Sequence, residues 1–162
     1  MALVYLLLGG NLGDRLNILE SAAAKLEERL GKIEQKSSVY ETEPWGFSAD
    51  QYFLNQVLKI NTEMSAPDVL KEVLQIEVGL GRERTTENVT SRTMDIDILF
   101  YDDIIMEEKE LIIPHPRLHL RKFTLVLLNE LDENFIHPTL GRSMKTLLYE
   151  CEDEQAVKLF VN

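Results

Sequence analysis

The stretch RTMDIDILFYDD, residues 92 to 103, decides the fold because it places two carboxylates inside an otherwise apolar run. Side chains alternate across a strand with a period of two, so Asp95, Asp97 and Leu99 are predicted to share one face of a strand. The opposite face carries Met94, Ile96 and Ile98. The two carboxylates then project about 7 Å apart along the backbone. Either this face is the solvated side of an edge strand, or the paired charges bind a divalent cation.

Hydrophobic periodicity predicts the elements on the N-terminal side of this strand. Residues 3–8, 33–43 and 52–62 have strand patterns, and apolar residues from Leu16 to Leu30 form a helical stripe that stops at Gly31. A second helix begins at a Ser65 cap and runs towards Gly79. The order β-α-β-β-α-β is the ferredoxin-like split arrangement of α+β domains, with both helices on one face of the sheet.

The C-terminal part predicts smaller elements added to this sheet. Residues 104–106 and 111–113 are expected to pair as a short hairpin, and residues 122–131 and 143–150 are expected to be short helices. No linker divides the chain, and 162 residues suit one domain with a substantial core. We therefore expect residues 1–162 to be a single domain.

Composition and charge exclude several classes of function. The net charge of −11 argues against a general nucleic-acid binder and against binding to an anionic membrane surface. Cys151 is the only cysteine, so no intrachain disulfide is possible and a reducing cytoplasm is the natural compartment. The opening ALVYLLLGG is too short to span a bilayer and lacks the features of a signal peptide, so it is predicted to be a buried strand.

Arginines gather around the two aspartates. Five of the eight lie between residues 82 and 121, namely Arg82, Arg84, Arg92, Arg117 and Arg121. A guanidinium group fits phosphate oxygens, so a polyphosphate held by magnesium on one side and arginines on the other is one interpretation. The alternative is solvated surface charge paired with nearby glutamates. The first interpretation predicts transfer of a phosphoryl or pyrophosphoryl group.

Other residues add candidate contacts. The GGNLGDR segment lacks the spacing of a phosphate-binding P-loop and is predicted to be a turn and helix cap. His115 lies between two prolines that keep the backbone extended, whereas His119 and His137 are interpreted as structural. Phe53 and Asn55 share a strand face, so they either stack on and read a flat heterocycle or form a core aromatic beside a polar edge.

These motifs together resemble the 6-hydroxymethyl-7,8-dihydropterin pyrophosphokinases, folate-pathway enzymes that transfer pyrophosphate from ATP to a pterin alcohol and release AMP. The resemblance runs from near the start to about residue 130. Its segments are LGGNLGDR, SSVYETEPWGF, FLNQV, IEVGLGRER, RTMDIDILF and IPHPRLHLRKF. The family's fold is also ferredoxin-like, and its members use ATP as co-substrate with two Mg²⁺ ions.

The resemblance implies a role for each matched residue. Asp95 and Asp97 would hold both Mg²⁺ ions, which bridge the ATP phosphates and the pterin hydroxyl, and Arg82 and Arg92 would stabilise the transferring group. The implied ATP-binding residues are Glu77, Arg82, Arg84, Arg92, Ile98, His115 and Arg121. The implied pterin-binding residues are Thr42, Pro44, Trp45, Phe53, Asn55 and Phe123. Phe53 and Phe123 would sandwich the ring.

Loops 44–51 and 82–91 would close over both substrates in the resembling family. The family often has Gly-Pro immediately before the residue that matches Arg92. This sequence departs from that pattern, with Asn88, Val89, Thr90 and Ser91 in these and the preceding positions.

The resemblance also implies small-molecule partners only, ATP and the pterin alcohol. We expect the chain to be a monomer or weak homodimer.

Two alternatives come from other functional classes. A non-catalytic ferredoxin-like module could bind a nucleotide or small ligand for regulation, but it would leave the paired aspartates without a function. A two-metal phosphoesterase would use those aspartates, but it would give Phe53, Asn55 and Phe123 no role. The nucleotide product formed with a pterin alcohol discriminates among the three.

Overall fold

The main sheet is antiparallel and is built around β1, which pairs with β4 on one side and with β5 on the other. The computed structural model describes residues 1–43, 52–80 and 94–161. The strand order is β5-β1-β4-β3-β8, and β2 also pairs with β4. The strands are β1 (Ala2–Gly10), β2 (Ile33–Lys36), β3 (Tyr40–Thr42), β4 (Phe53–Thr62), β5 (Asp95–Tyr101) and β8 (Val157–Leu159).

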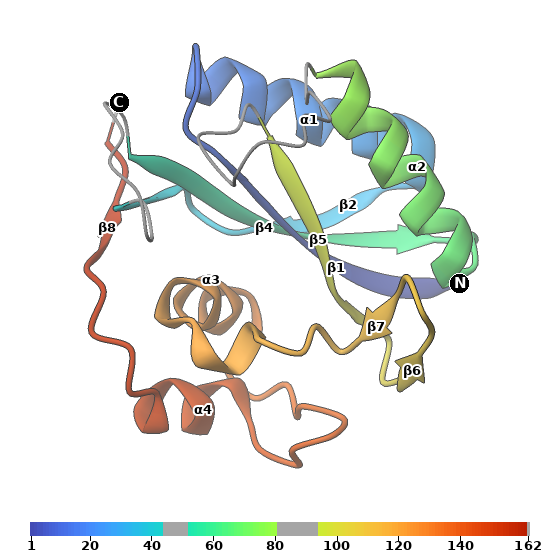
Figure 1. The fold of residues 1–162 in the computed structure, drawn as a ribbon. Helices are drawn as coiled ribbons and strands as arrows, with labels where there is room; N and C mark the ends of the chain where they lie inside the picture. The colour runs from blue at the N-terminus through green and yellow to red at the C-terminus, as the bar shows by residue number, and fades with distance from the viewer. Residues whose placement is uncertain (44–51, 81–93, 162) are drawn as a thin grey trace.

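The described residues form four α-helices, which cover both faces of the sheet (Figure 1). Two helices, α1 (Arg15–Leu30) and α2 (Ala66–Gly79), lie on one face, and α3 (Lys122–Asp132) and α4 (Met144–Glu150) lie on the other. Between β5 and α3 the chain forms a small hairpin and a 3-10 turn. These are β6 (Met106–Glu107), β7 (Ile112–Ile113) and η1 (Leu118–Leu120). The result is a mixed α/β fold.

Helix ends follow the capping chemistry of the sequence. The Asp14 side chain accepts the N–H of Asn17 at the start of α1, and the Ser65 hydroxyl accepts the N–H of Asp68 at the start of α2. Helix α1 ends at Gly31, where φ is +145° and an added Cβ would lie 2.0 Å from the carbonyl oxygen of Asn61. Only glycine fits at this turn.

Two apolar cores hold the layers together. The first lies between the sheet and helices α1 and α2, and includes Leu6, Leu26, Val73, Ile96 and Ile98. The second lies between the sheet and helices α3 and α4, and includes Leu7, Val57, Leu99, Phe100 and Leu128. Alternation along the strands sends successive side chains into opposite cores, except at a bulge in β5, where Leu99 and Phe100 both enter the second core. The predicted placement of both N-terminal helices on one face is confirmed.

The structure differs from the predicted elements at two edges of the sheet. The strand predicted for residues 33–43 is two strands, because the chain leaves the ladder at Ser37. The Ser37 hydroxyl accepts the N–H of Val57, replacing a backbone acceptor. Strand β8 was not predicted. The two C-terminal helices and the hairpin are confirmed, and none of the helices described has the length and apolar composition needed to cross a membrane.

Candidate active site

Strand β5 presents Asp95 and Asp97 on the sheet face that also carries α3. In the ladder with β1, Asp95 lies opposite Gly9 and Asp97 opposite Leu7. Leu99, two residues further, packs in the core beneath α3, whereas Ile96 and Ile98 pack in the core beneath α1 and α2. The predicted alternation is therefore confirmed for this stretch. Both carboxylates are half-buried.

Glu77 fixes β5 between the two aspartates. Its side chain is 2% exposed, and its Oε2 accepts the backbone N–H of Ile96 at 2.8 Å. A carboxylate that accepts a backbone N–H is a strong acceptor in a buried setting. Helix α2 is thus joined to the one residue that separates Asp95 from Asp97, so Glu77 holds the aspartate pair in register.

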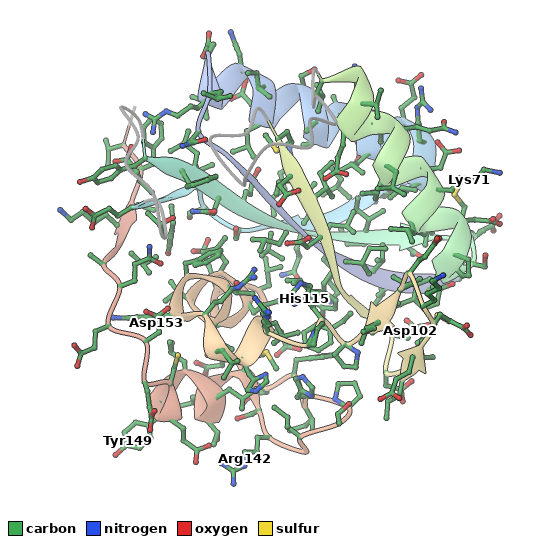
Figure 2. The ribbon with its side chains drawn as sticks, in the orientation of Figure 1. Lys71, Asp102, His115, Arg142, Tyr149 and Asp153 are labelled. Atoms are coloured by element: carbon green, nitrogen blue, oxygen red, sulfur yellow. The ribbon has the colours of Figure 1, made fainter. Side chains whose placement is uncertain are left out.

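A β-bulge in β5 places His115 next to the aspartates. Ile98 pairs with Leu6 and Phe100 with Tyr5, so Leu99 has no partner residue in β1. The Leu99 carbonyl instead accepts the backbone N–H of His115 at 3.0 Å. In Figure 2, His115 lies near the centre of the molecule, between α3 and the hairpin of β6 and β7. The bulge therefore brings a segment from beyond the hairpin to the aspartate strand.

His115 is neutral at physiological pH. Burial and, to a smaller extent, the positive charges of Arg121 and Arg117 together lower its pKa to about 4, and Asp95 partly opposes them. The Nδ1 atom accepts the backbone N–H of Arg117 at 3.1 Å, so Nε2 carries the ring proton. The pKa effects show that Asp95, His115, Arg117 and Arg121 share one electrostatic neighbourhood. This neighbourhood combines an imidazole donor with two guanidinium groups.

A hollow of about 260 Å³ opens beside Asp97 and His115. Strand β5, helix α2 and the hairpin enclose it, and two of its lining residues, Ile98 and His115, were predicted to bind ATP. Its lining residues are Leu70, Ile96, Asp97, Ile98, Lys109, Glu110, Leu111, Ile112, His115 and Pro116. Leu70 and residues 109–112 were not predicted from the sequence, because only the folded chain brings α2 and the hairpin to β5. A larger shallow hollow of about 730 Å³ lies near Lys32 and Asp68 and contains none of the predicted site residues.

The residues predicted to bind a heterocycle lie across the sheet from Asp95. Asn55 on β4 is opposite Gly9, so Gly9 separates Asn55 from Asp95 in one row of the sheet. At ordinary strand spacing the two residues lie about 10 Å apart. Asn55 is 3% exposed, and its Nδ2 donates to Thr42 Oγ1 at 3.0 Å and to the Tyr40 carbonyl at 3.4 Å. The amide therefore has a fixed orientation.

Two aromatic residues flank this row. Phe53 pairs with Thr42 in the ladder of β3 and β4, and strand alternation places it on the same face as Asn55. Phe123 lies in the first turn of α3 and packs against the core beneath that helix. The structure thus brings Thr42, Phe53, Asn55 and Phe123 to one side of the sheet, next to the aspartate pair. Pro44, Trp45, Arg82, Arg84 and Arg92 lie outside the described residues.

The remaining predicted structural residues lie outside the candidate site. His137 contacts Phe100 at 5.6 Å and His119 at 6.2 Å between ring centroids, inside or beside the core under α3. Asp14 caps α1 as expected for GGNLGDR, which is a turn and helix start. Among the described residues, no group of three or more His, Cys, Asp or Glu side chains is arranged to hold a metal ion. Asp95 and Asp97 remain the candidate pair of ligands.

Comparisons with known proteins identify relatives of this chain. The family model described as 7,8-dihydro-6-hydroxymethylpterin-pyrophosphokinase matches residues 5–133. The chain is 40% identical over 160 residues to the 2-amino-4-hydroxy-6-hydroxymethyldihydropteridine pyrophosphokinase of Aquifex aeolicus, covering 99% of this chain and 96% of the relative. It is 38% identical over 130 residues to the Bacillus subtilis protein of the same name, covering 80% of this chain and 77% of the relative.

Solved structures share the fold. A crystal structure of HPPK-DHPS in complex with substrates matches with a TM-score of 0.74 and 16% identity, over 92% of this chain. The wild-type Plasmodium falciparum HPPK-DHPS protein with SDX-DHP matches with a TM-score of 0.73 and 20% identity, over 93% of this chain. This chain covers 43% of each of those proteins.

Proposed function

Because the chain belongs to the 7,8-dihydro-6-hydroxymethylpterin-pyrophosphokinase family, we propose that the face of the sheet carrying Asp95, His115 and Asn55 is its active site. The protein is an ATP-dependent pyrophosphokinase that transfers a pyrophosphoryl group from ATP to the hydroxymethyl group of 6-hydroxymethyl-7,8-dihydropterin in folate biosynthesis. One observation carries the assignment of the site. A single glycine, Gly9, separates the proposed phosphate side at Asp95 from the proposed pterin side at Asn55.

Asp95 and Asp97 would hold two Mg²⁺ ions. The donor set fits this metal, because Mg²⁺ takes one or two carboxylates together with substrate phosphates and keeps some of its water. Gly9 opposite Asp95 has no side chain to fill the space beside that carboxylate. Bound Mg²⁺ supplies charge neutralisation for the phosphates and polarises the phosphorus that is attacked.

The ATP side is supported by the hollow beside Asp97 and by the charges around His115. Ile98, Leu70 and Leu111 give the hollow an apolar wall that suits a flat base. Neutral His115 offers its Nε2–H to a phosphate oxygen, and Arg121 offers a permanent positive charge. Arg82, Arg84 and Arg92 are proposed to contact the same phosphates, with Arg82 and Arg92 stabilising the charge that develops during transfer.

The pterin side is supported by the fixed amide of Asn55. Because Nδ2 already donates to Thr42 and Tyr40, Oδ1 is the atom that the amide offers to an N–H group of the ring. Phe53 and Phe123 supply aromatic faces on the same side of the sheet, and aromatic rings stack with offset geometry. Pro44 and Trp45 are proposed to complete the pocket. Loops 44–51 and 82–91 would then close over both substrates and exclude water.

In the reaction, the oxygen of the pterin hydroxymethyl group attacks the β-phosphorus of ATP. A new bond forms between that oxygen and the β-phosphorus, while the bond from the β-phosphorus to the oxygen bridging to the α-phosphate breaks. The bridging oxygen leaves as part of AMP, and the hydroxyl proton is released. The residues of this chain position the two reactants in line, and such positioning is worth several powers of ten in rate.

We also propose the finer features of the architecture. The strand order β5-β1-β4-β3 with α1 and α2 on one face supports a ferredoxin-like arrangement, to which α3, α4 and β8 are additions. The match of residues 5–133 to one family model supports a single pyrophosphokinase domain over residues 1–162. The single cysteine and the use of ATP support a cytoplasmic location.

The nucleotide product tests the proposed function. Protein incubated with ATP, MgCl₂ and 6-hydroxymethyl-7,8-dihydropterin should form AMP and a pterin diphosphate in equal amounts, measured by ion-exchange chromatography. ADP as the product would exclude attack on the β-phosphorus. Breakdown of ATP without the pterin would favour the phosphoesterase, and ATP binding without any product would favour the regulatory module.

Substitution of the aspartates tests the site separately. Asp97→Asn keeps the shape of the side chain and removes its charge, so AMP formation should fall by about 1,000-fold because metal-assisted charge stabilisation is lost. Circular dichroism should show an unchanged fold. A matched control is Asp103→Asn, which removes an aspartate charge beyond the end of β5 and should retain activity. Equal activity in Asp97→Asn and the unaltered protein would remove the metal assignment.

A further inference from the structure

The segment that follows α4 returns to the edge of the main sheet and runs beside β3. Figure 1 shows it in red, passing α3 and ending at β8. Its residues 153–160 contact two of the elements that carry proposed pterin-binding residues, β3 with Thr42 and α3 with Phe123. None of these residues is part of the segment matched by the family model, which ends at residue 133. We therefore considered what each contact does to the pocket.

Asp153 caps α3 from outside the helix. Its Oδ2 accepts the backbone N–H of Lys122, the first residue of α3, at 3.0 Å, and its Oδ1 accepts the N–H of Gln155 at 2.9 Å. The residue at the usual capping position, Arg121, makes no side-chain cap. A carboxylate at a helix N-terminus satisfies an otherwise unpaired N–H and complements the helix dipole. Figure 2 shows Asp153 beside α3. The turn that it fixes carries Phe123.

Gln155 holds the end of β3. Its Nε2 donates to the carbonyl oxygen of Glu43 at 2.6 Å, and Glu43 directly follows Thr42. Its Oε1 is buried and has no hydrogen-bond partner among the residues that the structure describes. Burying an amide oxygen without a partner is unfavourable, so the bond to Glu43 is the interaction that keeps this side chain in place. Two residues later, Val157 lies opposite Thr42 in the ladder of β3 and β8.

The far end of the segment is fastened as well. Phe160 donates its N–H to the Val39 carbonyl at 2.9 Å, and the Arg15 guanidinium lies 5.6 Å from the centre of the Phe160 ring. The same guanidinium contacts Glu41 on β3 at 2.7 Å and the Tyr52 carbonyl, just before β4, at 2.8 Å. Residues 153–160 are therefore anchored at both ends and cannot shift without moving β3.

We propose that residues 153–160 are a positioning element of the pterin pocket, in which Gln155 sets the place of Thr42 and Asp153 sets the place of Phe123. This inference rests on the proposed function, because the segment can position the pterin pocket only if Thr42 and Phe123 bind the pterin. Asp153 and Gln155 are positioning residues, since they act through Thr42 and Phe123 and contact neither substrate.

Gln155→Glu is the sharpest variant, because it preserves the shape of the side chain and removes the donor to Glu43. Fluorescence titration should show about 10-fold weaker binding of the pterin alcohol, since a small displacement of a positioning group has a large effect. The dissociation constant of a non-hydrolysable ATP analogue should change by less than about twofold, as for a substitution remote from its site. Glu154→Gln is the matched control: Glu154 is exposed and adjacent, and both constants should be unchanged.

A double-mutant cycle tests Asp153. Asp153→Ala should weaken pterin binding by about 10-fold in the unaltered background and by less than about twofold in a Phe123→Ala background, because the effect passes through that ring. Asp153→Asn, which keeps one acceptor oxygen, should recover part of the affinity. Thermal unfolding confirms that each variant is folded at the assay temperature.

Three results separate the claims. If the folded Gln155→Glu and Asp153→Ala variants bind the pterin as the unaltered protein does, the inference is wrong and the proposed function stands. A loss of pterin and ATP affinity by equal factors in Gln155→Glu would also overturn it, because that pattern reports general loosening. If the unaltered protein forms no AMP from ATP and the pterin, the proposed function fails, and the inference fails with it.

Discussion

Gly9 lies between Asn55 and Asp95, and an added methyl group there would contact the Asn55 amide. A Cβ built at Gly9 would lie 3.0 Å from Asn55 Oδ1, closer than an ordinary contact. Gly9→Ala should therefore displace the amide and raise the KM for the pterin about 10-fold, with a smaller effect on the KM for ATP. Steady-state kinetics with each substrate varied in turn would measure this.

Gly79→Ala is the control for that change. Within the described part of the chain, an added Cβ at Gly79, the last residue of α2, meets only the end of the flexible Lys25 side chain at 4.0 Å. Both KM values should stay within about twofold of those of the unaltered protein. An unchanged pterin KM in Gly9→Ala would mean that the Asn55 amide is not where the pterin binds.

Because of His137, we expect the free energy of unfolding to fall in mild acid. Burial and, to a smaller extent, the neighbouring His119 together lower its pKa to about 4. The unfolded chain takes up this proton near pH 6.5, while the folded chain does so only near pH 4, so the free energy of unfolding falls as the pH drops through this window. Asn at this position could still accept the N–H groups of Thr139 and Leu140, which now bond to His137 Nδ1.

His137→Asn should therefore make stability less dependent on pH. Between pH 7 and pH 4.5 the unaltered protein should lose about 1 to 2 kcal/mol more than the variant, measured by urea unfolding at both values. His115 is present in both proteins, so its contribution to the pH dependence of stability cancels in the comparison. Parallel losses in the two proteins would show that His137 takes up its proton equally in the folded and unfolded states.

The face on which a single side chain lies was predictable from the sequence where a strand or helix pattern determined its direction. Alternation alone placed Asp95 and Asp97 on one face and Ile96 and Ile98 on the other, and the structure agrees. The bond from Glu77 to the N–H of Ile96 was not predictable from spacing, because it joins a helix and a strand that meet only in three dimensions. The sequence placed the two proposed ligands on one face but did not predict what holds them in register.

At the scale of elements, Glu130 joins the end of α3 to β3. Its Oε1 accepts both the N–H of Ser38 at 2.6 Å and the Ser38 hydroxyl at 2.7 Å, and its Oε2 accepts the Tyr40 hydroxyl at 2.7 Å. Burial raises the pKa of Glu130, but these hydrogen bonds outweigh it and leave the pKa below its ordinary value. The contribution to stability is therefore present above pH 4.5 and is lost as the pH falls.

Glu130→Gln should destabilise the protein by about 1 kcal/mol at pH 7, a modest value because the carboxylate is exposed. The difference from the unaltered protein should shrink as the pH falls towards 3, which urea unfolding across this range would measure. A constant difference at every pH would show that lost packing, and not the charge of Glu130, explains the effect. Glu133→Gln at the end of the same helix is the control.

Elements were predictable where periodicity was long and their ends were capped locally. The two long helices and the three strands at the centre of the sheet follow the predicted order, with Ser65 and Gly31 at the expected caps. Strand β8 was not predictable, because it has three residues, two of them exposed, that carry no strand pattern and pair only after the chain has returned to β3. The start of α3 was likewise set by a distant residue, Asp153.

At the scale of the whole molecule, the two cores lie on opposite faces of the sheet, and only one of these faces carries the proposed site. The core beneath α1 and α2 supports the sheet from behind, while α3 lies over the face that carries the aspartates, Asn55 and the two phenylalanines. The bulge at Leu99 and the return of the C-terminal segment bring His115, Asp153 and Gln155 to this same face. Because this arrangement depends on the complete fold, the sequence predicted candidate residues on β4 and β5 but not the contacts that Asp153 and Gln155 make beside them.

The protein has a net charge of −11, which repels a substrate as anionic as ATP. Binding of ATP therefore depends on positive charge held locally at β5. The direct measurement is electron paramagnetic resonance with Mn²⁺ in place of Mg²⁺, in the presence of a non-hydrolysable ATP analogue and the pterin. We predict two Mn²⁺ ions bound per chain by the unaltered protein, and loss of this binding in Asp95→Asn/Asp97→Asn while the pterin is still bound. Two Mn²⁺ ions retained by that folded variant would contradict the assignment of these carboxylates.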